Sequence, residues 1–212
     1  MTIKSNVLFK NRIVLIIPID AIFQFSCYIG YMSKCEYNPE KLKALFHYVI
    51  WRVGTNAGFG ATKLYKIAWF ADARQFALTG KSITGSEYIK EEFGPVPTKA
   101  RQVRSRLVGS GEIREWRDSG LFGAPWRFQA LTGPDLSLFS ADELATINYW
   151  IRHIDEDHTA TSISEESHNY GWEIAKLKEP LPFSAILANR VREPNEAELS
   201  WAKERIAEVG LS

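Results

Sequence analysis

The widest hydrophobic pattern in the chain lies between Lys63 and Gly80. Apolar residues recur there at the spacing of a helix, and a second, largely aromatic set lies beside the first. The two sets are Leu64, Ile67, Ala68, Ala71 and Leu78, and Tyr65, Trp69, Ala73 and Phe76. A helix that is apolar over so much of its circumference must be packed from several sides. The pattern therefore predicts a central helix, with Gly80 as its left-handed end.

Two further helices have clear start signals. Asn38 is a good N-cap before Pro39, and the apolar helical face that follows ends at Gly54. Ser140 and Glu143 have the spacing of a capping box at the start of another amphipathic stretch. Both signals predict amphipathic helices that pack one face against the central helix.

Beyond Gly80 the chain is expected to be extended, to turn at Gly94 and Pro95, and to enter a helix at Pro97 or Thr98. The inner stripe of this helix is Ala100, Val103 and Leu107, and its basic residues, mostly on the outer face, are Lys99, Arg101, Arg104 and Arg106.

The segment that follows this helix predicts a β-hairpin, because Trp126, Phe128 and Ala130 alternate with Arg127 and Gln129 after a glycine-containing loop. The predicted fold class is therefore α+β and predominantly α-helical. We expect a single compact helical domain with one small β-hairpin. A helix followed directly by a hairpin is also the order of elements in a winged-helix domain.

We divide the chain into an N-terminal extension (1–37), a helical domain (38–190) and a C-terminal segment (191–212) that packs on the domain. A short helix is expected at 162–168, and an amphipathic helix is expected at about 196–209. The chain contains no internal repeat and no low-complexity tract.

Residues 1–31 differ from the rest of the chain. Their apolar run is interrupted by a proline, an acid and an amide, so it predicts neither a membrane-spanning helix nor a cleavable signal peptide. Three interpretations stay open: a packing arm, a weak membrane anchor, or translated upstream sequence with the working start at Met32. We favour the last, and we expect a cytoplasmic protein with no membrane partner, in which Cys27 and Cys35 are reduced.

Charge and motif content narrow the possible functions. The chain has 26 basic and 25 acidic residues, which excludes a nucleic-acid binder that relies on bulk positive charge. The four histidines form no known zinc motif, and no phosphate-binding glycine motif is present. The carboxylate run 155–157 is expected to be solvated. We therefore expect no metal, no cofactor and no catalytic set, and a protein that is not an enzyme.

The basic helix and the hairpin leave DNA binding as an alternative function. The cations concerned are Lys99, Arg101, Arg104 and Arg106 on the helix, and Arg114, Arg117 and Arg127 on the hairpin. In a winged helix they would lie in the major groove and on the phosphates. A solvated helix face, balanced by Glu112 and Glu115, is the simpler interpretation, and the low net charge favours it.

His168 and Trp172 are four residues apart in the sequence SEESHNYGW. A histidine stacked on a tryptophan at a helix end is an ordinary structural corner. A binding pocket is the alternative interpretation, and we favour the structural one.

Three motifs resemble those of the Panacea domain, which SocA-type antitoxins share with the phage-associated proteins called GepA. The family patterns are K-L-x-K-hydrophobic-x-hydrophobic-F-A-D, G-x-hydrophobic-T-G-x-x-Y, and G-P-V. The matching residues here are Lys63, Leu64, Lys66, Phe70, Ala71 and Asp72; Gly80, Ile83, Thr84, Gly85 and Tyr88; and Gly94, Pro95 and Val96. Ser164, His168 and Trp172 match a later S-x-x-x-H-x-x-x-x-W segment with a shorter final spacing. The likeness covers roughly residues 39–190.

The resemblance implies a non-enzymatic antitoxin that neutralises a toxin encoded beside it by direct binding. One family member also delivers its toxin to a protease, so the resemblance implies a protease as a further partner. The motif residues are expected mainly to hold the domain together: Lys63, Leu64, Lys66, Asp72, Gly85, Tyr88, Gly94, Pro95, Val96, His168 and Trp172. We expect Lys63 and Asp72 to take part in a buried polar contact whose partners the sequence does not identify. Gly94→Ala should destabilise the fold if Gly94 has a positive φ.

The hairpin offers candidate contacts for such a toxin. Trp116, Phe122, Trp126 and Arg127 are of the residue types that anchor protein interfaces. The same aromatic residues could instead cover the helical core, an interpretation that the sequence supports equally well.

Overall fold

A computed structural model describes residues 8–9, 12–13, 36–117, 124–183 and 200. The chain divides into two compact units, residues 1–35 and 36–212. In the described part of the first unit, β1 (Leu8–Phe9) pairs antiparallel with β2 (Arg12–Ile13). The predicted helix at 196–209, apart from Ser200, lies outside the described residues, as do Phe122 and the two cysteines.

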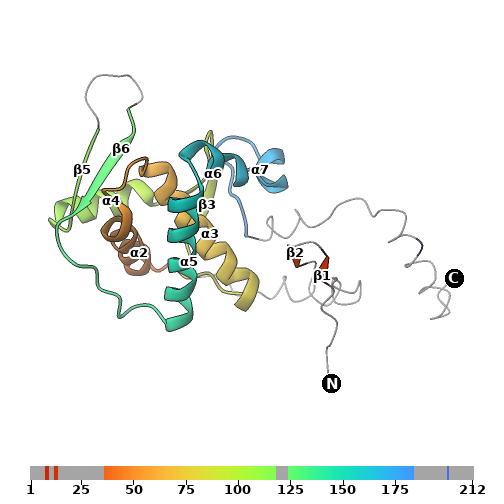
Figure 1. The fold of residues 1–212 in the computed structure, drawn as a ribbon, viewed down its shortest axis with the longest axis horizontal. Coiled ribbons are helices and arrows are strands. Elements are labelled where there is room, and N and C mark those ends of the chain that lie inside the picture. The colour runs from red at the N-terminus through yellow and green to blue at the C-terminus, as the bar shows by residue number, and fades with distance from the viewer. Residues whose placement is uncertain (1–7, 10–11, 14–35, 118–123, 184–199, 201–212) are drawn as a thin grey trace. The chain divides into compact units, whose positions relative to one another are not determined.

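The described residues of the second unit form six helices and two β-hairpins (Figure 1). In chain order these are α2 (Pro39–Val53), α3 (Ala61–Thr79), β3 (Tyr88–Glu91), β4 (Gly94–Pro97), α4 (Ala100–Gly109), β5 (Ile113–Arg117), β6 (Trp126–Ala130), α5 (Ala141–Asp157), α6 (Ala160–Glu166) and α7 (Tyr170–Ile174). The predicted class, a compact and mostly helical α+β fold, is confirmed.

The central position predicted for α3 is confirmed. This helix packs against α2, α5, α6 and β4, so its apolar residues are covered from several sides. Leu64, Ile67 and Ala68 are completely buried, and Trp69 is almost so. Gly80 ends the helix in the left-handed conformation, with a φ of 75°.

The predicted starts of α2 and α5 are also confirmed. The Asn38 side chain accepts hydrogen bonds from two backbone amides of the first turn, those of Glu40 and Lys41. Ser140 and Glu143 form the expected capping box. The Glu143 carboxylate also accepts from Lys41 Nζ at 2.7 Å, so the two helix starts are joined by an ion pair. Local capping therefore contributes to tertiary packing here.

The prediction that Gly94 and Pro95 form a turn into the next helix is wrong. The turn lies at residues 92–93, and Gly94 begins a strand that pairs with β3. Pro95 and Pro97 lie two residues apart in β4, so the backbone nitrogens of both face away from β3. The ladder needs no N–H donor at either position, and both prolines are therefore tolerated. The predicted start of α4 was Pro97 or Thr98, and the helix begins slightly later, at Ala100.

The chain after α7 returns along β3 and extends this small sheet. The Lys178 amide donates to Lys90 O at 2.8 Å, the Lys90 amide donates to Glu179 O at 2.9 Å, and the Leu181 amide donates to Tyr88 O at 2.7 Å. β3 therefore lies between β4 and the segment 178–181.

The predicted β5–β6 hairpin is confirmed and extends from the helical body (Figure 1). Ile113 and Phe128 are buried on the face that covers the core, whereas Arg114 and Trp116 alternate onto the opposite, exposed face. Among the described residues, no helix combines the length and hydropathy needed to cross a membrane.

Candidate functional site

Asp72 is the centre of a buried polar cluster between α3 and the segment that leads into β3. Its carboxylate accepts from the Thr84 amide at 2.8 Å, from the Thr84 hydroxyl at 2.5 Å and from the Tyr88 hydroxyl at 2.8 Å. Burial raises the pKa of Asp72 to about 6, although the hydrogen bonds from Thr84 and Tyr88 lower it in part. This cluster fixes the start of the β3–β4 hairpin on α3.

Lys66 is the centre of a second cluster, six residues before Asp72 on α3. Its side chain is only 1% exposed, and its Nζ donates to Pro95 O at 3.2 Å. Burial lowers the pKa of Lys66 to about 7. Two serines of the α6 region approach the same hairpin, because Ser164 Oγ donates to Phe93 O at 2.7 Å and Ser167 Oγ lies beside Gly94.

Trp172 holds α7 against the same hairpin. His168 stacks on its indole with ring centroids 3.5 Å apart, and Lys90 Nζ lies 4.0 Å from the ring centroid. The Trp172 Nε1 donates to Glu91 O at 3.1 Å. Burial, and then the nearby Lys66 and Lys90 charges, lower the pKa of His168. The stack forms the structural corner that the sequence favours.

These three clusters contain most of the motif residues, and we name them together the hairpin clamp. The clamp consists of Lys66, Asp72, Thr84, Tyr88, Gly94, Pro95, Ser164, Ser167, His168 and Trp172. Its members come from α3, from β3 and the segment before it, from β4, and from the stretch 164–172 that contains the end of α6 and the start of α7. The clamp contacts join the β3–β4 hairpin and the segment before it to α3, α6 and α7.

Lys63 and Asp72 do not contact each other, although both are buried. Nine residues are two and a half helical turns, so the two side chains leave α3 on opposite sides. The Lys63 Nζ donates instead to Asp155 O at 3.3 Å and lies 3.9 Å from Asp155 Oδ1. Asp155 is therefore not simply a solvated carboxylate, which corrects the prediction made for that run.

Three other motif residues have packing roles. Leu64 is fully buried, and Val96 packs against the main core. Gly85 has a φ of +65°, and a side chain there would collide with the backbone of Glu36 and Tyr37. These residues therefore shape the chain around the clamp without adding polar contacts to it.

Gly94→Ala is expected to lower the free energy of unfolding by about 2–4 kcal/mol. Gly94 has a φ of +95°, and an added methyl group would displace the Lys66 ammonium and the Ser167 hydroxyl; left-handed strain and overpacking each cost about 1–2 kcal/mol. Gly109→Ala is the control, because its added methyl group meets nothing within 4 Å. Equal urea midpoints for the two variants would contradict the assignment.

The outer face of the β5–β6 hairpin carries arginine beside tryptophan. Trp116 is 38% exposed, and the Arg114 guanidinium lies 5.1 Å from its ring centroid. Trp126 is half-buried, and Arg104 and Arg117 each lie 4.6 Å from its ring centroid. Arg117 and Trp126 alternate onto the opposite face, the one that also carries Ile113 and Phe128. We name Arg114 and Trp116 the hairpin face.

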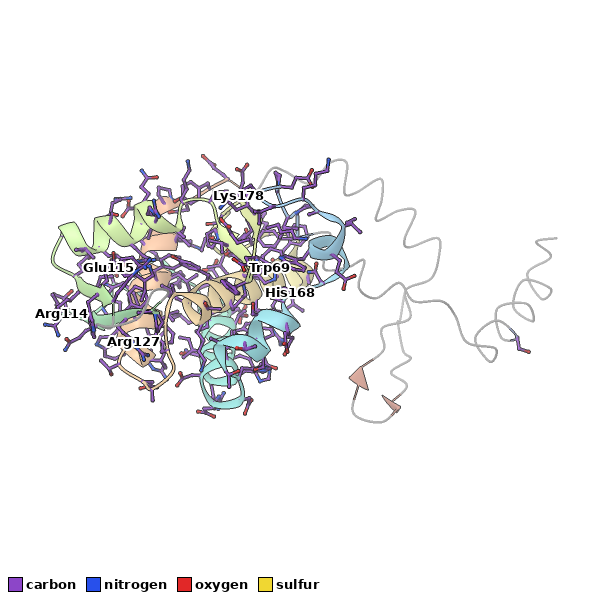
Figure 2. All side chains as sticks on the ribbon, turned by 90° about the horizontal axis from the view of Figure 1, so that it is seen from above. Trp69, Arg114, Glu115, Arg127, His168 and Lys178 are labelled. Carbon is purple, nitrogen blue, oxygen red and sulfur yellow. The ribbon has the colours of Figure 1, made fainter. Side chains whose placement is uncertain are left out.

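Two of the candidate partner contacts lie deeper in the structure than Trp116. Arg127 is half-buried and donates to Phe59 O at 2.9 Å, and Trp126 packs against the core. The core-covering interpretation therefore fits Trp126, whereas Trp116 presents an exposed anchor. Figure 2 shows Arg114 and Arg127 at one end of this unit, and His168 and Lys178 toward the other.

The placement of Arg104 on the outer face of α4 is wrong. It is buried and donates to Glu115 and to the Tyr65 hydroxyl at 2.8 and 2.7 Å, because β5 folds back over that side of the helix. Arg106 is exposed but is paired with Glu40 at 2.7 Å. The basic surface of α4 is therefore reduced mainly to Lys99 and Arg101.

The sequence did not indicate a second exposed apolar surface. Phe93, Ile174 and Leu177 are each at least 60% exposed, and they lie on the β3–β4 turn and around α7. We name them the α7 patch. The clamp explains why they share a region, since Trp172 and Ser164 fasten α7 and α6 to this turn.

One group of side chains in the described part of the chain has the composition of a metal site. His153, His158 and Glu166 lie close together although they follow no familiar spacing. His153 and His158 lie at the end of α5, and Glu166 at the end of α6 joins them in space, a meeting that no sequence motif indicates.

The fold and the clamp define a mostly helical α+β domain in which buried polar residues fix a β-hairpin onto a central helix. Residues 64–173 match the family model described as "Antitoxin SocA-like, Panacea domain". Because the match covers just over half of the chain, the protein belongs to this family. Comparison with curated proteins and with solved structures gives no significant match.

Proposed function

We propose that this protein neutralises a partner toxin by direct, stoichiometric binding and without catalytic turnover. Membership of an antitoxin family supports a toxin as the partner. The side chains with the most strongly shifted pKa values, Lys66, Asp72 and Tyr88, are buried and hydrogen-bonded at the hairpin. A surface that binds is therefore a better account of the chain than a site that makes or breaks bonds.

The hairpin face is the proposed toxin-binding surface. Tryptophan and arginine dominate the binding energy of many interfaces, and both are exposed here on a projecting hairpin. The inner face of the hairpin is anchored by Phe128 and by Arg104, so the outer side chains are presented on a rigid support. A preorganised surface loses less conformational entropy on binding.

We expect Arg114→Ala combined with Trp116→Ala to weaken toxin binding by at least about 30-fold, the effect of removing one binding hot spot of 2 kcal/mol. The partner used is the product of the gene beside this one, co-expressed and purified with the full chain. Binding is measured by calorimetry, and function is measured as rescue of growth. The melting temperature of the variant should remain near that of the unmodified protein, because both side chains are exposed.

Ile174→Ala combined with Leu177→Ala is the matched control, because it truncates two exposed side chains on a different surface, the α7 patch. Loss of binding in this control alone would move the toxin site to the α7 patch. A failure of the unmodified chain to bind would contradict direct neutralisation. Rescue by far less than one antitoxin molecule per toxin would indicate turnover instead. Delivery of the toxin to a protease stays a prediction.

A further inference from the structure

The end of α5 and the whole of α6 bring three metal-binding side chains together. One ligand atom each from His153, His158 and Glu166 lies within 4.8 Å of the other two. The His158 Nε2 and a Glu166 carboxylate oxygen are 3.3 Å apart. Two ligands of a tetrahedral zinc ion have this separation, because zinc bonds to nitrogen and oxygen are about 2.0–2.2 Å long. The other separations between ligand atoms in this group are at most 4.8 Å.

The Nδ1 atom of each imidazole also has a polar partner. The His153 Nδ1 lies 2.8 Å from Asp157 Oδ2, and the His158 Nδ1 lies 3.2 Å from Ser162 Oγ. Ser162 is itself fixed, because its hydroxyl accepts from the Thr159 amide at 3.0 Å in the capping box of α6. Histidines that bind metals usually engage their second nitrogen in this way, which orients the ring.

We propose that His153, His158 and Glu166 bind one divalent transition-metal ion of the zinc type. Two imidazoles with one carboxylate suit zinc, whereas magnesium and calcium prefer sites made of oxygen ligands. His153 and Glu166 are partly exposed, so solvent can reach the ion and supply a fourth ligand. The ion would connect the end of α5 with α6, the helix from which Ser164 donates to Phe93 O in the turn of the β3–β4 hairpin.

The test titrates Zn²⁺ into the metal-stripped full chain. Calorimetry should give one ion per chain, and the melting temperature should rise by about 5–10 °C at a hundredfold excess over Kd. Mg²⁺ at the same concentration should produce no rise. The titration is repeated with Cys27→Ser plus Cys35→Ser, which removes any thiolate ligand, and the result should be the same.

Glu166→Gln should weaken zinc binding at least about tenfold. Glu165→Gln is the matched control, because it neutralises the adjacent exposed carboxylate of the same helix and should leave the affinity unchanged. Either of two results would overturn the proposal. One is the absence of stoichiometric binding in the chain without cysteines, and the other is equal affinity in the Glu166 and Glu165 variants.

Discussion

Asp72→Ala is expected to lower the free energy of unfolding by about 3–5 kcal/mol. The substitution leaves the Thr84 amide and the Tyr88 hydroxyl buried without their acceptor, and each such group costs about 1–3 kcal/mol. The Thr84 hydroxyl can turn to Ser86 Oγ, which is 2.9 Å away, so it adds little. Loss of the packed carboxylate accounts for the remainder. Equilibrium unfolding in urea measures the change.

A second variant, Asp72→Asn, tests the electrostatic part of this argument. Because the pKa of Asp72 is raised from 3.8 to about 6, the folded protein keeps a proton that the unfolded chain releases between these pH values. The stabilising contribution is therefore full below about pH 4 and is lost as the pH rises to about 6. The change is up to about 3 kcal/mol. Asparagine cannot titrate, so the difference between variant and unmodified protein should change across this window.

Glu156→Gln is the control for the pH experiment, because this carboxylate is exposed on α5. Its unfolding profile should run parallel to that of the unmodified protein from pH 4 to pH 7. If the Asp72→Asn profile were also parallel, the buried carboxylate would not be the group that holds the proton. A stable Asp72→Ala variant would likewise contradict the role of Asp72 in the clamp.

The helices were predictable because their determinants are local. Asn38 and Ser140 cap the amides of their own helices, and the apolar period of α3 shows how broadly that helix is covered. The β5–β6 hairpin was predictable for the same reason, since the alternation around Phe128 lies within one strand.

What the sequence did not predict depends on contacts between distant segments. Pro95 and Pro97 argue against a strand until it is known which side of β4 is paired. Arg104 resembles a solvated helix residue until β5 and Tyr65 cover it. Glu166 of α6 joins His153 and His158 only through the turn between α5 and α6. In each case the deciding partner lies on another element.

The motif residues could be identified from the sequence, but the contacts between them could not. Lys66, Tyr88 and Trp172 are spread over more than a hundred residues, and no local pattern states that they meet. The family resemblance indicated that they belong together. The structure adds the physical reason, which is that each fastens one edge or turn of the β3–β4 hairpin.

Lys66→Met is expected to raise the free energy of unfolding at pH 7 by about 1–3 kcal/mol. Lys66 is buried with one hydrogen bond, to Pro95 O, whose loss costs about 1–2 kcal/mol. The cost of burying the ammonium is larger, because a pKa lowered from 10.5 to about 7 corresponds to up to about 5 kcal/mol. Replacing a buried charge by an apolar side chain of similar volume is often stabilising. Lys66 therefore lowers the free energy of unfolding at pH 7 relative to an apolar side chain at the same position.

The pH dependence gives the sharper test. Between pH 7 and pH 10.5 the unfolded chain keeps a proton on Lys66 that the folded protein has released, so stability contributed by this group rises with pH. From pH 7 to pH 9.5 the unmodified protein should gain about 3 kcal/mol from it, and Lys66→Met should lack this gain. Lys99→Met, at an exposed position on the turn before α4, should behave like the unmodified protein. A destabilised Lys66→Met variant with an unchanged pH profile would show that the Pro95 hydrogen bond outweighs burial of the charge.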